Sequence, residues 1–303
     1  MLLNWANAAI LSAAILAAVN TVDSHLITKR MPSLRAFLIL PAVIAAIYGG
    51  IILYRFPIPQ GVDTVPILFA IASALLRSAG IALFLFMMQT EEVSRIMPVV
   101  NTHPVFVAIL AVPLLGEALI HLEWTAIFIT VAGAVLISIK PGVSLVKTWL
   151  GKPLIFPLAA SLFLAGANLT SKYALEHISF WNMYAIGALG MAFIFLALAL
   201  RPATIRQFRN IDRPRSTLSI QVCNESLVPI AAIFLYWAIQ NGPVSLVSTI
   251  AGAQPVFVFI YAFILSRISS TFLLEQSMGK ETMALRIVSI AMIVAGVTII
   301  HLV

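Results

Sequence analysis

Long runs of apolar residues recur along the whole chain, separated by short segments that are polar or rich in proline and glycine. Each run is close to the roughly 20 residues that a helix needs to cross the hydrocarbon core of a bilayer. The runs lack the ten-residue alternation of a transmembrane β-strand, and only helices or closed barrels satisfy their backbone groups in lipid. The pattern therefore predicts an all-α integral membrane protein with ten transmembrane helices, at residues 3–27, 34–54, 66–88, 94–115, 124–139, 153–175, 180–200, 217–239, 244–266 and 284–302.

The composition supports this prediction and excludes an ordinary soluble domain. Hydrophobic residues make up 61% of the 303 residues and charged residues 10%, whereas soluble domains carry about 25% charged residues. The first apolar run has no basic segment before it and continues past signal-peptide length, so we expect a retained first span rather than a cleaved signal. Ten spans would use about 200 residues, which leaves no room for a sizeable domain outside the membrane.

The sequence lacks the motifs that would indicate a cofactor-dependent enzyme. Its single cysteine, Cys223, allows no disulfide within the chain, and no Cys/His cluster has the spacing of zinc ligands. A Walker-type phosphate loop is absent from the sequence, so we do not expect ATP to drive this chain directly. We therefore expect no metal, no cofactor and no enzymatic activity.

The two halves of the chain are similar to each other. A shift of 151 residues aligns HPVFV at 103–107 with QPVFV at 254–258, and a slightly longer shift aligns Gly133 with Gly296. This self-similarity predicts two five-helix repeats, residues 1–150 and 151–303. Because five crossings leave the chain on the opposite side of the membrane, the second repeat is expected to be inverted relative to the first.

Basic residues favour one side of the predicted topology. Fifteen of the 18 Lys and Arg fall in loops on one side, whereas Arg55 alone falls on the other. By the positive-inside rule the basic side is cytoplasmic, so we expect a multi-pass protein of the cell membrane with both termini outside. The net charge of +7 then requires no nucleic-acid partner. The basic run 201–215 is expected to be a cytoplasmic loop that also contacts anionic lipid.

Taken together, the motifs resemble those of the drug/metabolite transporter superfamily in its ten-helix EamA-like branch. In the first half the resemblance rests on EEVSRIMPVVNTHPVFVAILAVPLLGEAL and WTAIFITVAGAVLI. In the second half it rests on GPVSLVSTIAGAQPVFVFIYAFIL and IVSIAMIVAGVTII, and on LFLAGANLTSKYAL with its lysine at Lys172. The second half lacks the Gly-Glu pair of the pattern, because Arg267-Ile268 stand at the positions that align with Gly116-Glu117.

The resemblance implies a bundle of ten helices that surrounds a central cavity between the two halves. It implies that helices one, three, four, six, eight and nine line the cavity, and that transport follows alternating access. It also implies cytoplasmic termini, whereas the distribution of basic residues favours termini outside. On this point we follow the charges.

Polar residues inside the predicted spans are the candidates for a substrate site, because an ionised side chain at mid-bilayer costs about 2.5–3.5 kcal/mol. An interior proline frees a backbone carbonyl and kinks the helix, so we expect spans four and nine to be cavity walls or gates. A kink that serves packing alone is the alternative. The candidate cavity residues are Asn20, Asp23, Arg77, Asn101, His103, Asn168, Lys172, Asn224, Glu225 and Gln254, and the candidate kink residues are Pro98, Pro104 and Pro255.

Two of the charged candidates are expected to meet. Under the 151-residue shift Glu225 falls about one helical turn from Arg77, which predicts contact across a pseudo-two-fold axis near the cavity. This contact would serve substrate binding or simply lock the halves together. Without a basic partner Glu225 would instead be a candidate proton carrier. For Asp23 and Lys172 an interfacial anchor is the alternative, and for the amides it is helix packing.

These features predict a secondary active transporter that moves a small polar metabolite, amino-acid-like or another zwitterion, in the export direction. The expected partners are this small-molecule substrate and membrane lipids, with protons as the candidate coupling ion and no nucleic acid. One alternative is proton-coupled transport of an organic cation or drug, or transport of a lipid-like molecule. Alternatives from a different class are an intramembrane enzyme and a non-transporting scaffold.

Overall fold

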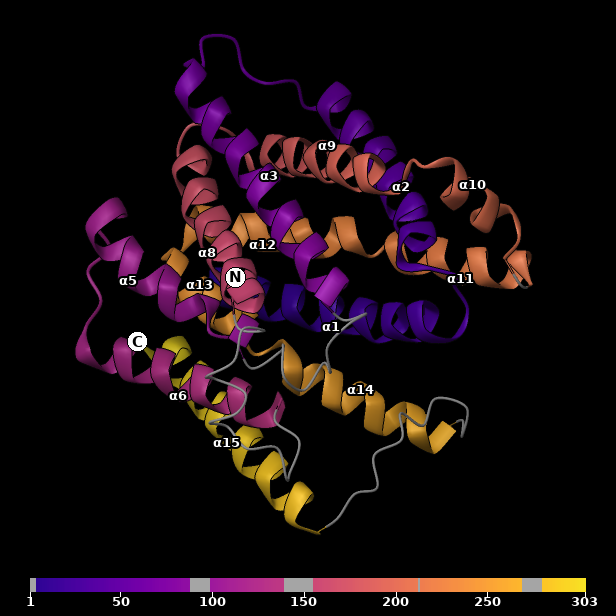
Figure 1. Ribbon diagram of the computed structural model, residues 1–303. Helices are drawn as coiled ribbons and strands as arrows, with labels where there is room; N and C mark the ends of the chain where they lie inside the picture. Colours follow the sequence, from indigo (N-terminus) through magenta and orange to yellow (C-terminus); the bar gives the residue numbers. More distant parts are fainter. Residues whose placement is uncertain (1–3, 88–98, 139–154, 212, 269–279) are drawn as a thin grey trace.

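The computed structural model describes residues 4–87, 99–138, 155–211, 213–268 and 280–303, and these residues form helices without any strand (Figure 1). The helices are α1 (Trp5–Lys29), α2 (Leu34–Arg55), α3 (Thr64–Met87), α5 (His103–Leu115), α6 (His121–Ser138), α8 (Ile155–Leu175), α9 (Phe180–Ala199), α10 (Pro202–Arg209), α11 (Pro214–Glu225), α12 (Val228–Asn241), α13 (Val244–Ala251), α14 (Gln254–Ile268) and α15 (Lys280–Leu302).

Eight helical segments among the described residues are long and apolar enough to cross a membrane. They are α1, α2, α3, α6, α9, α11 with α12, α13 with the first part of α14, and α15. Two further helices, α5 with 13 residues and α8 with 21, also follow predicted apolar runs. The prediction of an all-helical, multi-pass membrane protein is confirmed, and the count of ten spans stays a prediction.

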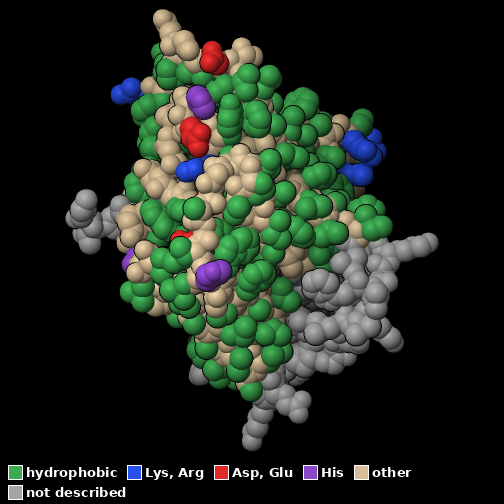
Figure 2. Space-filling model, turned by 90° about the vertical axis from the view of Figure 1, so that its left-hand side faces the viewer, with side chains coloured by type: hydrophobic (Ala, Val, Ile, Leu, Met, Phe, Trp, Pro, Cys, Tyr) green, Lys and Arg blue, Asp and Glu red, His purple; other side chains and the backbone are tan. Residues whose placement is uncertain are grey.

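The outer surface is apolar, as a lipid-facing surface must be. Large side chains such as Phe193, Ile51 and Leu68 are more than half exposed. Figure 2 shows apolar side chains spread over most of one face of the molecule. In water such a surface would favour aggregation, whereas in a bilayer it contacts acyl chains without cost.

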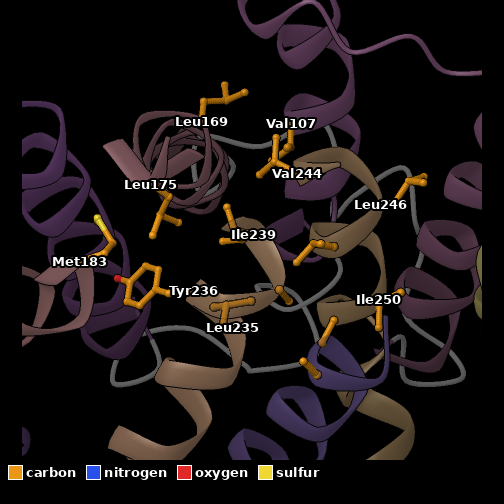
Figure 3. Packing of buried hydrophobic residues seen from close by; sticks show 14 of the residues in the cluster. Val107, Leu169, Leu175, Met183, Leu235, Tyr236, Ile239, Val244, Leu246 and Ile250 are labelled. Carbon is orange, nitrogen blue, oxygen red and sulfur yellow. The ribbon is translucent and has the colours of Figure 1, made fainter. Parts of the chain in front are cut away.

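The closest helix packing joins the first half of the chain to the second. α2 packs along α9, α3 along α8, α6 along α15 and α1 along α12, while α5 contacts α13 (Figure 1). The largest buried cluster likewise draws on both halves, with Val107 from one and Ile239 and Val244 from the other (Figure 3). Each half therefore buries its apolar faces mainly against the other half.

Two glycines allow α6 and α15 to approach closely. A Cβ on Gly133 would lie 2.8 Å from the backbone oxygen of Ser289, and a Cβ on Gly296 would lie 2.0 Å from Thr130 Oγ1. Small residues at a helix crossing let the two backbones pack in van der Waals contact, which drives association in lipid. These two glycines are the ones that the sequence aligns between the halves.

Two helix breaks occur at positions that are 151 residues apart. Val99 and Val100 are helical, a turn follows at Asn101 and Thr102, and α5 then begins at His103. Likewise α13 ends at Ala251, a turn follows at 252–253, and α14 begins at Gln254. The two breaks therefore fall at the positions that the sequence aligns between the halves.

The prolines at these breaks start helices rather than kinking them. Pro104 and Pro255 each occupy the second residue of a new helix, where the backbone N–H has no partner inside the helix in any case. The predicted kinks are therefore full breaks. Pro98 lies outside the described residues.

A third break divides the predicted eighth span. α11 ends at Glu225 and α12 begins at Val228, with Pro229 in its first turn. The corresponding α3 runs without interruption from Thr64 to Met87. Glu225 is therefore held at the C-terminal end of a helix, although its position in the sequence predicts the middle of one.

Two charged side chains, one from α8 and one from the non-helical segment after α5, cap the junction between α12 and α13. Lys172 Nζ donates to the backbone oxygens of Ile239 (2.9 Å), Gln240 (3.4 Å) and Gly242 (3.0 Å), at the C-terminal end of α12. The Glu117 carboxylate accepts from the backbone N–H groups of Val244 and Ser245 and from the Ser245 hydroxyl, at the N-terminal end of α13. Each charge thus faces the helix end whose dipole has the opposite sign.

The local sequence explains why Glu117 reaches this position. Pro243 is the N-cap of α13 and has no side chain that could accept from the first N–H groups, so the cap must come from elsewhere. Gly116 ends α5 in the left-handed conformation (φ 68°), which turns the chain back and directs the next residue toward α13. The Gly-Glu pair is therefore a helix stop followed by a cap for a helix in the other half.

Replacing Gly296 with alanine should destabilise the protein, because the new methyl group would overlap Thr130. Overpacking of this kind costs about 1–3 kcal/mol. Gly50 offers a matched control, since a Cβ there meets no atom within 4 Å. We expect Gly296→Ala to lower the melting temperature in detergent by several degrees and Gly50→Ala to leave it unchanged. Equal melting temperatures would contradict the close α6–α15 contact.

Replacing Glu117 with alanine should remove the cap of α13 and leave buried N–H groups without an acceptor. Loss of an N-cap costs about 0.5–2 kcal/mol, and we expect the upper end because three donors lose their partner. The exposed Glu176 provides the control, as Glu176→Ala removes one carboxylate without removing a helix cap. The measurement is thermal unfolding in detergent, and a Glu117→Ala protein as stable as Glu176→Ala would show that the cap contributes nothing.

Candidate functional site

A cavity of about 140 Å³ lies between α1, α2, α3, α9, α11 and α12. Its lining is mainly apolar, but it includes a guanidinium group, a carboxyl group, two phenol rings and one hydroxyl group. The lining residues are Leu16, Pro41, Ile44, Ala45, Arg77, Ser78, Ile81, Tyr184, Gly187, Ala188, Met191, Glu225, Val228, Pro229, Ala232, Leu235 and Tyr236. A small apolar pocket with few polar groups is the usual form of a small-molecule site.

Arg77 of α3 supplies the positive charge of the cavity. Its Nη2 donates to Asn168 Oδ1 of α8 at 2.7 Å, and its guanidinium lies 5.5 Å from the centre of the Tyr236 ring. Its Nε is buried and has no hydrogen-bond partner. Arg77 is therefore positioned by an amide and an aromatic face, and its buried Nε donor is left without a partner.

Asn168 connects Arg77 to the broken ninth span. This side chain is 5% exposed, and its Nδ2 donates to Ser248 Oγ of α13 at 2.9 Å. Both ends of the amide are therefore used, one toward the cavity and one toward the helix that precedes the break. Asn168 acts as a positioning residue for Arg77 and does not itself line the cavity.

Glu225 supplies the negative charge of the cavity from the end of α11. Its side chain is 5% exposed and lines the cavity. Among the described residues it forms neither an ion pair nor a hydrogen bond through its carboxyl group. Its electrostatic neighbour is Asp23 of α1 rather than Arg77.

The predicted contact between Arg77 and Glu225 is therefore wrong, although both residues line the same cavity. The alignment assumed two continuous helices in the same register, whereas the eighth span is broken directly after Glu225. Arg77 instead finds its acceptor in Asn168. The two opposite charges consequently face one cavity without neutralising each other.

Asn224 joins Asp23 to α11. Its Nδ2 donates to Asp23 Oδ1 at 2.7 Å and to the backbone oxygen of Val19 at 3.2 Å. Asp23 is partly buried and does not line the cavity. The structure thus brings Asp23, Asn224 and Glu225 together at one contact between α1 and α11.

The remaining candidates lie away from this cavity. Lys172 caps α12, as described above. Asn101 donates to Ser138 Oγ at 3.2 Å, and the His103 ring nitrogen Nδ1 lies 3.2 Å from the backbone oxygen of Val100. Gln254 has a buried Nε2 without a partner. Asn20 is exposed and, within the described residues, forms no hydrogen bond through its side chain.

Sequence analysis missed the two tyrosines and Gly187 as cavity residues. The Tyr236 ring lies beside Met183 (Figure 3), and a Cβ on Gly187 would lie 2.9 Å from the Tyr236 hydroxyl. A usable signal was present, because Tyr184, Gly187, Ala188 and Met191 follow the i, i+3, i+4, i+7 spacing of one helix face. A glycine on such a face leaves room beside the tyrosine.

The comparisons with known proteins agree with this architecture. A solved crystal structure whose title gives only "Crystal structure of protein" has a TM-score of 0.69 and is 15% identical, covering 98% of this chain and 96% of that chain. At this identity the likeness concerns the fold alone. No curated protein matches the sequence. Residues 4–139 match the model of the EamA-like transporter family, which is the family that the sequence motifs resemble.

Proposed function

We propose that the protein is a secondary transporter that carries a small zwitterionic metabolite across the membrane by alternating access, with the cavity as its substrate site. One observation carries this proposal: Arg77 and Glu225 line a single small, otherwise apolar cavity and do not pair with each other. Two separated opposite charges in a low-dielectric pocket are complementary to a molecule that carries both charges.

Each charged group has a distinct role in this proposal. Arg77 binds the substrate carboxylate, because it lines the cavity and a guanidinium is a planar donor that matches carboxylate geometry. Glu225 binds the ammonium group. The apolar wall of the cavity, which includes Ile44, Met191 and Leu235, accommodates the rest of the molecule.

The proposed architecture is two inverted five-helix repeats, residues 1–150 and 151–303, with α5 and α8 belonging to the two further crossings. The pattern of helix pairs supports it. Exchanging the halves maps the α3–α8 contact onto the α1–α12 contact and leaves the α2–α9 and α6–α15 contacts unchanged. The two helix breaks that are 151 residues apart support it as well. Discontinuous helices near the middle of a membrane are typical of transporters with inverted repeats.

We place the protein in the cell membrane with the basic loops in the cytoplasm, both termini outside, and transport in the export direction. The distribution of Lys and Arg supports this orientation. The exposed arginines on and beside α10, such as Arg206, Arg209 and Arg215, are well suited to anionic headgroups at the inner surface.

A second candidate is exchange of an organic cation for protons at Glu225. The observation that favours it is the buried Glu225 carboxyl group without an ion pair. The two candidate functions predict different roles for Arg77, because a substrate without a carboxylate cannot pair with its guanidinium group.

Replacing Arg77 with glutamine should therefore abolish transport of zwitterions, because the substrate carboxylate loses its partner. Hydrogen bonds to charged groups are worth about 1.5–3 kcal/mol, so we expect a loss of at least tenfold in kcat/KM. Arg77→Lys should recover only part of the activity. The measurement is uptake of a panel of amino acids, amines and organic cations into proteoliposomes.

The exposed Arg55 provides the control for this experiment, since Arg55→Gln removes one positive charge far from the cavity. Undiminished zwitterion transport by Arg77→Gln would refute the proposed substrate site. If instead only organic cations are carried, and Arg77→Gln leaves their transport intact, the second candidate replaces the first.

Replacing Gly187 with alanine should narrow the substrate range, because the methyl group would enter the space beside the Tyr236 hydroxyl. One methylene of difference in a pocket is worth about 1–3 kcal/mol. We expect transport of the larger substrates in the panel to fall about tenfold or more relative to the smallest one, while Gly50→Ala leaves the ratio unchanged. A uniform change for all substrates would indicate that Gly187 does not bound the site.

A further inference from the structure

The hydrogen-bond acceptor that positions Arg77 carries no charge. Arg77 Nη2 donates to Asn168 Oδ1 at 2.7 Å, and no carboxylate of the described residues forms an ion pair with the guanidinium. A carboxylate is the stronger acceptor for arginine, because its two oxygens match the guanidinium and the two charges are opposite. Such an ion pair would also cancel the positive charge of the guanidinium. The neutral amide therefore holds Arg77 in place and leaves its charge uncompensated.

The orientation of the Asn168 amide is fixed from both ends. A guanidinium has only donors, so the amide must present its oxygen to Arg77. Its Nδ2 then points to α13, where it donates to Ser248 Oγ at 2.9 Å. Both residues of this second contact are buried, Asn168 with 5% and Ser248 with 1% exposed surface. Ser248 therefore supplies the acceptor without which the Nδ2 group would be buried and unpaired.

Other contacts fix the helices that present these residues, without any substrate. Ser73, four residues before Arg77 on α3, donates through Oγ to the backbone oxygen of Ala167 on α8 at 2.8 Å. This contact sets the register of α3 against α8 one residue away from Asn168. On the other side, Glu117 accepts from the first N–H groups of α13. The arrangement around Arg77 is therefore preorganised, as a selective site requires.

We propose that Asn168 determines the charge selectivity of the cavity by positioning Arg77 without neutralising it, and that Ser248 fixes the orientation of the Asn168 amide. The inference rests on the proposed function, since a substrate carboxylate is the group that gains from an uncompensated guanidinium. A carboxylate at position 168 would take the place of that substrate group. Glu225 would then be the charged group of the lining that is left for a ligand, and the cavity would accept cations in place of zwitterions.

Asn168→Asp tests the proposal, because aspartate has nearly the same size as asparagine and keeps an oxygen for Arg77. Each zwitterionic amino acid of the transport panel is paired with the amine that has the same side chain but no carboxylate. In the unmodified protein we expect the zwitterion to be carried in preference to its amine. In Asn168→Asp the kcat/KM for zwitterions should fall by at least about tenfold, whereas that for the amines should stay the same or rise.

Asn182→Asp is the matched control. Asn182 is another buried amide with both ends in use, since it accepts from Ser179 Oγ and donates to the backbone oxygen of Phe56, each at 2.7 Å. It does not line the cavity, so the ratio of zwitterion to amine transport should stay as in the unmodified protein. A purely structural role of Asn168 predicts an equal loss for both substrates. Unchanged zwitterion transport in Asn168→Asp, or an equal fall for zwitterion and amine, overturns the proposal.

Two milder variants decide the question should Asn168→Asp fail to fold. Asn168→Ser shortens the side chain and adds no charge, and Ser248→Ala removes only the acceptor of the amide Nδ2. Both should raise the KM for zwitterions several-fold, because Arg77 is less well held, and both should leave the KM for the amines unchanged. Equal changes for the two kinds of substrate, or no change for either, contradict the positioning role.

Failure of the proposed function gives a different result. If the unmodified protein carries none of the zwitterions, the proposed function fails, and binding of acetate then decides about Asn168. A ligand that binds the folded state raises the melting temperature. Acetate should raise that of the unmodified protein and of Asn182→Asp but not that of Asn168→Asp. No shift in the unmodified protein, or an equal shift in all three proteins, overturns the proposal.

Discussion

Hydrocarbon forms no hydrogen bonds, so every polar group that this chain carries into the membrane needs a partner from the protein itself. Most of the structure follows from that constraint. Lys172 uses three backbone oxygens at the end of α12, and Asn168 uses both ends of its amide. Glu117 accepts from two backbone N–H groups and one hydroxyl group. The Glu117 contacts and the Arg77–Asn168 contact join the two halves of the chain, whereas the Lys172 contacts lie within the second half.

The described residues include several exceptions to this rule. Arg77 Nε and Glu225 border the cavity, with Gln221 one turn from Glu225, and Gln254 lies at the break before α14. The buried hydroxyl groups of Ser12 and Thr130 also lack a partner. Internal pairing of the groups at the cavity would stabilise the protein but would leave none of them for the proposed substrate. In the proposed transporter, the incomplete pairing at the cavity therefore provides selectivity at the expense of stability.

The sequence predicts the helices well, because hydropathy along the chain reports lipid contact directly. The predicted span 180–200 corresponds to α9 at Phe180–Ala199, and 34–54 to α2 at Leu34–Arg55. The partners of polar groups were harder to predict. Lys172 bonds to backbone oxygens, and every residue has one, so no side-chain pattern marks them. The Arg77–Glu225 contact failed because the position of a break within the eighth span decides which way Glu225 faces, and Pro229 alone does not fix it.

The cap formed by Gly116 and Glu117 belongs to one half only, since the aligned residues of the second half are Arg267 and Ile268. Under the proposed division into two repeats, the Gly-Glu cap is therefore found at only one of the two equivalent ends. In the proposed transporter the two mouths of the substrate path would therefore differ chemically. Alternating access would then exchange two states of unequal free energy even when the solute concentrations on the two sides are equal.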